Sequence, residues 1–188
     1  MANKTTVALT EDQFKEIITT MGTGGSGFRP NGRIAAALTL QANLGIRIED
    51  ILYLRPCDVI KDGGRYRLNI IERKTKKKRD FTVPLPVYQY IRLYAADNNI
   101  GENNRLFPVT ERNVQKYLKK VTDYIGLENI GTHSFRKLYA TKIYKENDYN
   151  IVLVQRLLQH SSVAMTQRYI GITSEIQERA IQNHVMLP

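Results

Sequence analysis

The chain has 188 residues, with 28 Lys and Arg against 18 Asp and Glu, which gives a net charge of +10. This length suits one domain with a full hydrophobic core, and the positive charge favours a phosphate-rich partner such as nucleic acid or an anionic membrane surface. One cysteine, Cys57, excludes an internal disulfide and cannot build a zinc site alone. Apolar runs are too short for a signal peptide or a spanning helix, so we expect a cytoplasmic protein without a membrane partner.

The first predicted element is an amphipathic helix over residues 11–21. Thr10 and Gln13 match a capping box, and apolar residues then recur at helical spacing. The glycine-rich stretch 22–27 ends the helix. It lacks the Gly-Lys-Ser/Thr ending of a phosphate-binding loop, so we interpret it as a flexible connector.

Two further helices are predicted on either side of Gly45. Residues 31–44 are alanine-rich and apolar, which indicates a buried helix, and a glycine at its end is typical of a left-handed cap. The sequence IRIEDILYL then starts a new helix at once. Arg47 is therefore expected at a helix start beside a tight bend.

A β-hairpin with a basic tip is predicted next. Residues 65–72 and 80–85 have the composition of strands, and between them runs RKTKKKR. We expect this run to form a cationic finger.

The remaining chain is helical by periodicity. The predicted helices cover residues 87–99, 112–126, 132–144, 150–159, 162–169 and 174–185. No repeat or composition shift marks a boundary. The expected fold is therefore mainly α with a small antiparallel sheet or hairpin (α+β), in one domain over residues 1–188.

The helix that begins near residue 132 raises a question of charge. Thr132 can cap its start, and His133 and Arg136 then lie three residues apart on one face. Because the helix dipole is already positive at this end, two cationic groups there indicate a bound anion.

Five segments, in order, resemble the motifs of the tyrosine recombinase (phage integrase) family: LGIRIEDIL, RKTKKKRDFTVPLP, HSFR, LLQHSS and TQRYIG. The resemblance covers nearly the whole chain and implies the catalytic-domain fold of that family and a site-specific DNA recombinase or integrase of a phage or other mobile genetic element. The catalytic residues that it implies are Arg47, Lys74, His133, Arg136, His160 and Tyr169, with Asp50 in support.

These residue types suit phosphodiester cleavage by a side-chain oxygen. Two arginines can hold both non-bridging phosphate oxygens in the transition state. His133 would donate a hydrogen bond or take the tyrosine proton, and His160 would hold a phosphate oxygen. Tyr169 would attack, leaving a 3′-phosphotyrosyl bond and a free 5′-hydroxyl that can reverse the step. This chemistry requires no metal or other cofactor.

The general acid that protonates the leaving 5′-oxygen is expected among the hairpin lysines. Lys74 precedes a threonine, as the family lysine commonly does, and it is our first choice. Counting back from the VPL strand favours Lys76 instead, and the two would share one face of a strand. The expected DNA contacts are Lys76, Lys77, Lys78, Arg79 and Lys137.

The resemblance also implies assembly on double-stranded DNA, as a tetramer at recombination sites. The last predicted helix, residues 174–185, either docks on a neighbouring subunit or packs on its own core. Family members commonly carry N-terminal core-binding and arm-binding domains. We expect a short recombinase that consists of the catalytic domain alone, and a catalytic fragment of a longer integrase is the alternative.

Two other functions are compatible with parts of the pattern. A type IB topoisomerase uses a similar set of residues, and a DNA-binding regulator could keep the fold without cutting. The complete set of two arginines, a lysine, two histidines and a tyrosine argues against the regulator. The target sequence, and the choice among integration, excision, inversion and resolution, are not encoded in these motifs.

Overall fold

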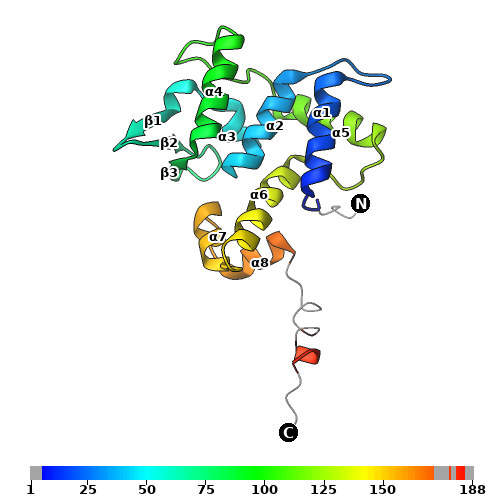
Figure 1. Cartoon of the computed structure of the whole chain (residues 1–188), viewed down its shortest axis with the longest axis vertical. Coiled ribbons are helices and arrows are strands. Elements are labelled where there is room, and N and C mark those ends of the chain that lie inside the picture. Colours follow the sequence, from blue (N-terminus) through cyan, green and yellow to red (C-terminus); the bar gives the residue numbers. More distant parts are fainter. Residues whose placement is uncertain (1–5, 172–177, 179–180, 185–188) are drawn as a thin grey trace.

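The structure is a computed structural model that describes residues 6–171, 178 and 181–184. Within these residues the chain forms a body of helices with one small sheet at its edge (Figure 1). The α-helices are α1 (Glu11–Thr23), α2 (Gly32–Leu44), α3 (Ile48–Tyr53), α4 (Leu85–Asp97), α5 (Glu111–Tyr124), α6 (Thr132–Glu146), α7 (Ile151–Leu158) and α8 (Val163–Ile170). The strands are β1 (Val59–Asp62), β2 (Arg65–Ile71) and β3 (Lys78–Val83), and a 3-10 turn covers Pro56–Asp58. The predicted mainly α fold with a small antiparallel sheet is confirmed.

The bend before α3 depends on Gly45. This residue closes α2 in the left-handed conformation, with φ of 61°. A side chain here would also collide with α6, because an added Cβ would lie 2.3 Å from Cδ1 of Tyr139. Glycine is thus required both for the turn and for the close approach of α6. The bend places Arg47 at the N-cap of α3.

The sheet has three antiparallel strands in the order β1-β2-β3, of which the sequence predicted only β2 and β3. Residues 72–77 form the turn between these two strands, where the Glu72 amide donates to the Lys77 carbonyl at 2.9 Å. Lys74 and Lys76 therefore lie in a turn. The prediction that they share one face of a strand was wrong, because strand alternation ends at Ile71.

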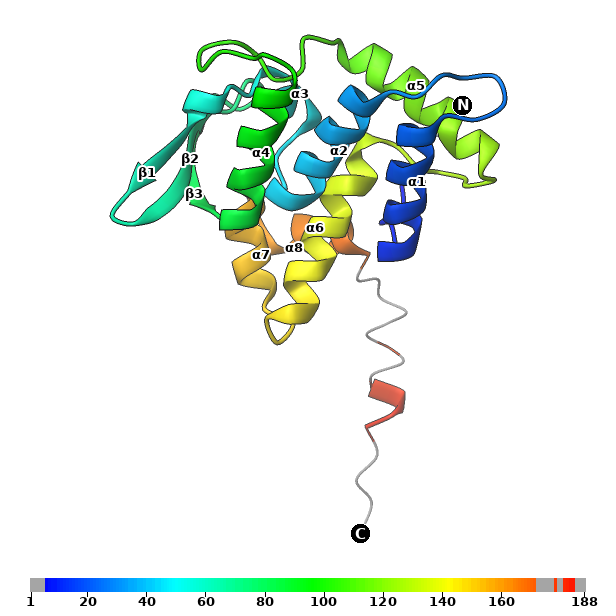
Figure 2. The same cartoon turned by 45° about the horizontal axis from the view of Figure 1, so that its top comes forward.

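The described residues form two hydrophobic cores of different size. The main core takes side chains from α1 to α5, from the sheet and from the first half of α6, including Phe135. A smaller core consists of Ala140, Val154 and Leu158, with Tyr169 packed against it. Figures 1 and 2 show α7 and α8 gathered at the far end of α6, away from α5. Helix α6 thus joins the main body to a small unit that carries Tyr169.

Other sequence predictions have mixed outcomes. The capping box of Thr10 and Gln13 is present. Thr132 was expected as a cap, but Gly131 occupies the N-cap of α6 and Thr132 is a buried helical residue. Most of the predicted helix at 174–185 lies outside the described residues. Of the helices that are described, none has the length and apolar character needed to cross a bilayer.

Candidate functional site

Arg47 is held by a buried carboxylate. Its guanidinium forms an ion pair with Glu72, whose side chain is fully buried. The same carboxylate accepts a hydrogen bond from the Thr75 hydroxyl at 2.5 Å and lies 3.4 Å from Nε of Arg79. Burial alone would raise the pKa of Glu72, but Thr75, Arg47 and Arg79 outweigh it and hold the pKa below its usual value. Glu72 is therefore ionised at neutral pH.

Arg136 lies in the first turns of α6 and is 2% exposed. One terminal nitrogen, Nη2, donates to the Leu158 carbonyl at 2.9 Å, while Nη1 is buried without a protein partner. Burial lowers the pKa of Arg136 to about 10, and the charges of Arg47 and Arg79 add to this effect. Arg136 still carries its charge at pH 7, so the site contains a buried cationic donor that favours an anion.

Tyr169, on α8, is close to this donor. Its hydroxyl is also buried without a protein partner. Burial raises the pKa of Tyr169 to about 12, an effect that the charge of Arg136, the contact of the hydroxyl with the Arg136 guanidinium and the charge of Arg47 partly oppose. The ring meets the His160 ring edge-on, with 5.0 Å between centroids. The hydroxyl is therefore protonated and confined beside two arginines.

The neighbouring residue Thr166 fixes the proton arrangement of His160. Nδ1 of His160 lies 3.1 Å from the Thr166 hydroxyl, which itself donates to the Ser162 carbonyl at 3.3 Å. Because that hydroxyl has only one proton, it accepts from the imidazole, and Nδ1 is the protonated nitrogen of the neutral ring. Burial lowers the pKa of His160 to about 4, with further contributions from Arg136 and Arg47. At pH 7 His160 is neutral, with the lone pair on Nε2.

His133 and Lys74 lie at the open side of the site, and both are exposed. Partial burial of the imidazole lowers the pKa of His133, and the charges of Arg136, Lys74 and Arg47 lower it further. The positive charge of Lys74 thus lies close enough to act on His133. The structure brings together all six residues that the resemblance implied as catalytic.

The depressed pKa values predict that acid destabilises the free protein. A histidine with pKa about 4 in the folded state and 6.5 as its ordinary value binds its proton more tightly in the unfolded chain, so stability falls as pH decreases through this range. We expect the midpoint of thermal unfolding to fall from pH 7 to pH 5, where most carboxylates are still ionised. His160→Gln, which keeps a donor toward Thr166, should reduce the slope and leave the part that comes from His133. An unchanged slope would contradict the assigned neutral state.

Asp50 supports the site indirectly. Its Oδ1 accepts from the backbone amide of Arg73 at 2.9 Å, and its Oδ2 is buried without a protein partner. Burial raises the pKa of Asp50, and the hydrogen bond from Arg73 partly opposes this. Asp50 thus fixes Arg73 in the hairpin turn, while Glu72 is the carboxylate paired with Arg47.

Two of the residues predicted to contact DNA are buried in the protein rather than exposed at the hairpin or on the surface of α6. Arg79 is not at the hairpin tip but in β3, where its side chain is 3% exposed and donates to the Leu157 carbonyl. Lys137 is also buried, and its amine donates to the Thr6 carbonyl at 2.6 Å. Their charges are turned toward protein groups. The other three lysines, Lys76, Lys77 and Lys78, are exposed, and their contact with DNA stays a prediction.

Sequence reasoning missed Glu72, Thr166 and the inward position of Arg79. A local signal existed for Arg79, because counting back in twos from the buried Val83 places it on the inner face of β3. No comparable signal marks Thr166, whose role depends on its contact with His160.

Comparison with known proteins agrees with this geometry. Residues 8–175 match the phage integrase family. A probable integrase/recombinase, YoeC of Bacillus subtilis, is 35% identical over 145 residues, which cover 73% of this chain and 77% of YoeC. Tyrosine recombinase XerA of Thermococcus kodakarensis is 28% identical, over 92% of this chain and 61% of XerA.

Solved structures show the same fold. The catalytic domain of bacteriophage HP1 integrase has a TM-score of 0.65 at 18% identity, with 94% of each chain covered. XerH recombinase, in a post-cleavage complex with its difH substrate, has a TM-score of 0.69 at 19% identity, over 95% of this chain and 53% of XerH. The chain thus spans about half to three quarters of these recombinases, except for the isolated HP1 domain.

The fold and the charged site together define a tyrosine recombinase catalytic domain. The chain belongs to the phage integrase family. Its relatives are integrases and site-specific tyrosine recombinases, so the comparisons support the recombinase function and not the topoisomerase or the regulator.

Proposed function

We propose that this protein cleaves and rejoins DNA at a specific site, with Tyr169 as the nucleophile. The observation that carries the proposal is that the Tyr169 hydroxyl and the Arg136 guanidinium are buried beside each other, with no hydrogen bond of good geometry from the hydroxyl or from Nη1 to a protein group. A phosphodiester would satisfy both at once, as acceptor for the guanidinium and as electrophile for the hydroxyl. A nicked suicide duplex, from which the released strand diffuses away, would trap the covalent adduct for a denaturing gel.

The proposed mechanism assigns the charged groups to the phosphate. Arg136 and Arg47 bind its non-bridging oxygens, which gain charge in the transition state. Arrival of the phosphate raises the pKa of the adjacent histidines, both neutral in the free protein. His133 is the proposed acceptor of the tyrosine proton. His160 donates to phosphate from Nε2 once protonated, while Nδ1 stays on Thr166.

The structure favours Lys74 over Lys76 as the general acid. Lys74 is exposed on the turn, and its charge is among the main causes of the lowered pKa of His133. Thr75, which follows Lys74, is bonded to Glu72 and ties the turn to the Arg47 ion pair. A lysine whose charge acts on His133 is near the other proposed catalytic groups, and this supports Lys74 as the proton donor to the leaving oxygen.

A substrate with sulfur as the 5′-bridging atom tests this assignment, because a thiolate leaves without a proton. We expect Lys74→Ala to cleave normal DNA far more slowly than the parent and to regain most of the rate on the sulfur substrate. Arg47→Ala should not be rescued, since its loss affects the non-bridging oxygens. If Lys76→Ala were rescued and Lys74→Ala kept nearly full activity on normal DNA, the role would belong to Lys76.

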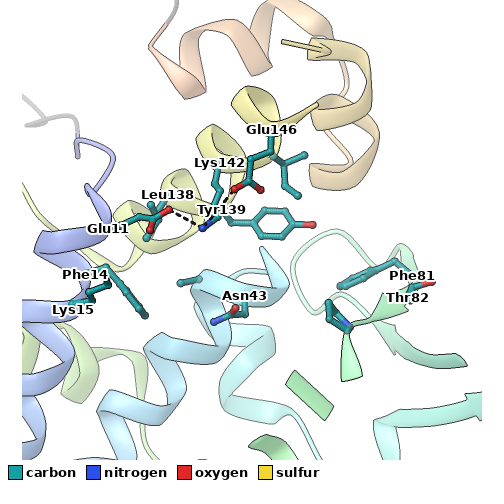
Figure 3. Close-up of a pocket in the computed structure, with 13 residues that line it drawn as sticks. Glu11, Phe14, Lys15, Asn43, Phe81, Thr82, Leu138, Tyr139, Lys142 and Glu146 are labelled. Atoms are coloured by element: carbon teal, nitrogen blue, oxygen red, sulfur yellow. Dashed lines mark hydrogen bonds and ion pairs between the residues drawn. The ribbon is translucent and has the colours of Figure 1, made fainter. Parts of the chain in front are cut away.

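We further propose that the protein acts as a tetramer on double-stranded DNA, and that residues 174–185 bind a neighbouring copy. An apolar groove of about 580 Å³ lies between α1, α2, β3 and α6 (Figure 3). Its floor includes Phe14, Phe81 and Leu138, and Lys142 spans its rim between Glu11 and Glu146. The C-terminal segment has the complementary composition, with Ile176, Ala180, Ile181 and Val185 at helical spacing.

This assembly predicts a specific loss when the groove is blocked. Ala42→Arg fills the groove with a long charged side chain, and we expect it to prevent tetramer formation on paired sites in analytical ultracentrifugation while cleavage of a single suicide duplex continues. Removal of residues 174–188 should have the same effect. Ala96→Arg, on the exposed face of α4, is the matched control. Tetramers formed normally by Ala42→Arg would exclude the groove as the docking site.

A further inference from the structure

We infer that Glu72 and Arg79 are positioning residues for the cleavage reaction. Glu72 holds the Arg47 guanidinium, and Arg79 connects that carboxylate to the end of α7, so that Arg47 and the unit carrying Tyr169 keep one relative arrangement. This inference rests on the proposed function. Neither residue is among the catalytic groups implied by the resemblance.

The first part of the connection is Glu72. Its side chain is fully buried and shared between Arg47, Thr75 and Arg79. Three guanidiniums, of Arg47, Arg79 and Arg136, lie close enough for their charges to affect one another. Glu72 is the ionised carboxylate between Arg47 and Arg79, and it offsets their repulsion. It also restricts Arg47 to one direction, which a long arginine side chain does not otherwise keep.

The second part is Arg79, whose two ends contact different parts of the fold. Nε forms an ion pair with Oε1 of Glu72 at 3.4 Å, without hydrogen-bond geometry, and Nη1 donates to the Leu157 carbonyl at 2.5 Å. That carbonyl belongs to the last turn of α7, where carbonyl groups lack partners within the helix. Gln159 adds a bond in the opposite direction, from its side chain to the Lys78 carbonyl at 2.8 Å. Strand β3 is thereby fastened to the end of α7.

The end of α7 is also where Arg136 binds. Arg136 donates a hydrogen bond to the Leu158 carbonyl, and Arg79 donates to the adjacent Leu157 carbonyl. From there the chain continues through His160 to α8, and the contact of His160 with Thr166 keeps the two segments together. A continuous path of polar contacts therefore runs from Arg47 through Glu72, Arg79 and α7 to the helix of Tyr169. A small displacement along this path changes the distance between the Arg47 guanidinium and the Tyr169 hydroxyl.

The test compares three variants of similar chemistry. Arg79→Lys keeps the buried charge but replaces the planar fork that bridges Glu72 and Leu157. Glu72→Gln keeps the volume and removes the charge. Arg67→Lys is the matched control, since Arg67 lies in the neighbouring strand and pairs with the exposed Asp62 and Asp80. The rate is measured in a single turnover on the suicide duplex at saturating protein, and the DNA dissociation constant is measured separately.

We expect Arg79→Lys and Glu72→Gln to slow cleavage by at least about tenfold, with DNA affinity within about twofold of the parent, because misplaced groups reduce the rate of the chemical step. Arg67→Lys should match the parent in both measurements. Each variant is then combined with Arg47→Ala. If Glu72 and Arg79 act through Arg47, they add little to the loss already caused by Arg47→Ala, whereas general damage to the fold would add in full.

Two results would overturn the inference while leaving the proposed function intact. One is parental cleavage by both variants, and the other is full additivity with Arg47→Ala. If Glu72→Gln does not fold, the cleavage rate of Arg79→Lys is the deciding measurement. If Arg79→Lys does not fold either, the contacts of Glu72 and Arg79 stabilise the fold and the inference that they position catalytic groups is wrong. Failure of the proposed function is distinguishable, because the parent itself would then give no adduct.

Discussion

Tyr169→Phe is expected to bind DNA with parental affinity and to form no covalent adduct. The substitution removes one oxygen and leaves the ring, its edge-on contact with His160 and the exposed lysines in place. Without that oxygen no phosphotyrosyl bond can form. The adduct is measured on a denaturing gel with a suicide duplex, and affinity by fluorescence anisotropy.

Other tyrosines near the site provide the control. Tyr139 and Tyr144 lie on α6 and pack against the same small core as Tyr169. Tyr139→Phe and Tyr144→Phe should both form the adduct. If Tyr169→Phe still became linked to DNA, the nucleophile would be one of these or Tyr149, and peptide mapping of the adduct would identify it.

Arg136→Ala should reduce the cleavage rate by on the order of a hundredfold or more, and Arg47→Ala by a similar factor. Each supplies a preorganised charge for the oxygens of the transition state, and loss of one such donor typically has an effect of this size. Lysine is a poor substitute, since it cannot present two parallel donors. Single-turnover rates at saturating protein separate this loss from any change in binding.

A neutral substrate makes the prediction for the arginines more specific. A methylphosphonate at the cleavage point has a methyl group in place of one charged oxygen, so it requires less positive charge for stabilisation. The ratio of parental to Arg136→Ala rates should be much smaller on this substrate than on normal DNA. Equal ratios on the two substrates would contradict the assignment of Arg136 to the non-bridging phosphate oxygens. An Arg136→Lys variant that cleaves normal DNA as fast as the parent would contradict it too.

Periodicity and capping predicted most helices because those signals are local. The Thr10 capping box and the apolar repeat of α1 are contained in one short segment. Strand β1 was missed because it has four residues, of which only Val59 is buried, and it is stabilised by pairing with β2. The N-cap of α6 was predicted one residue too late. Gly131, with extended backbone, precedes the helix, and its amide donates a hydrogen bond to the Ser134 hydroxyl.

The site shows the same division between local and tertiary information. Motifs at helix starts and turns identified Arg47, His133, Arg136, His160 and Tyr169, which the structure brings together. Within RKTKKKR, however, the sequence does not say which cation turns inward, since that depends on Glu72 and on the Leu157 carbonyl, far along the chain. The whole run was predicted to be exposed, but the Arg79 side chain is buried.

The small core beneath Tyr169 has a consequence for the dynamics of the enzyme. Ala140, Val154 and Leu158 bury little apolar surface compared with the main core, so the free energy of local opening at α7 and α8 is far below that of global unfolding. Such opening breaks the hydrogen bonds that Arg79 and Arg136 donate to the end of α7, and it moves Tyr169 away from Arg136 while helices α1 to α5 stay folded. Opening of this small unit therefore decides whether Tyr169 lies beside Arg136, independently of the stability of the main core.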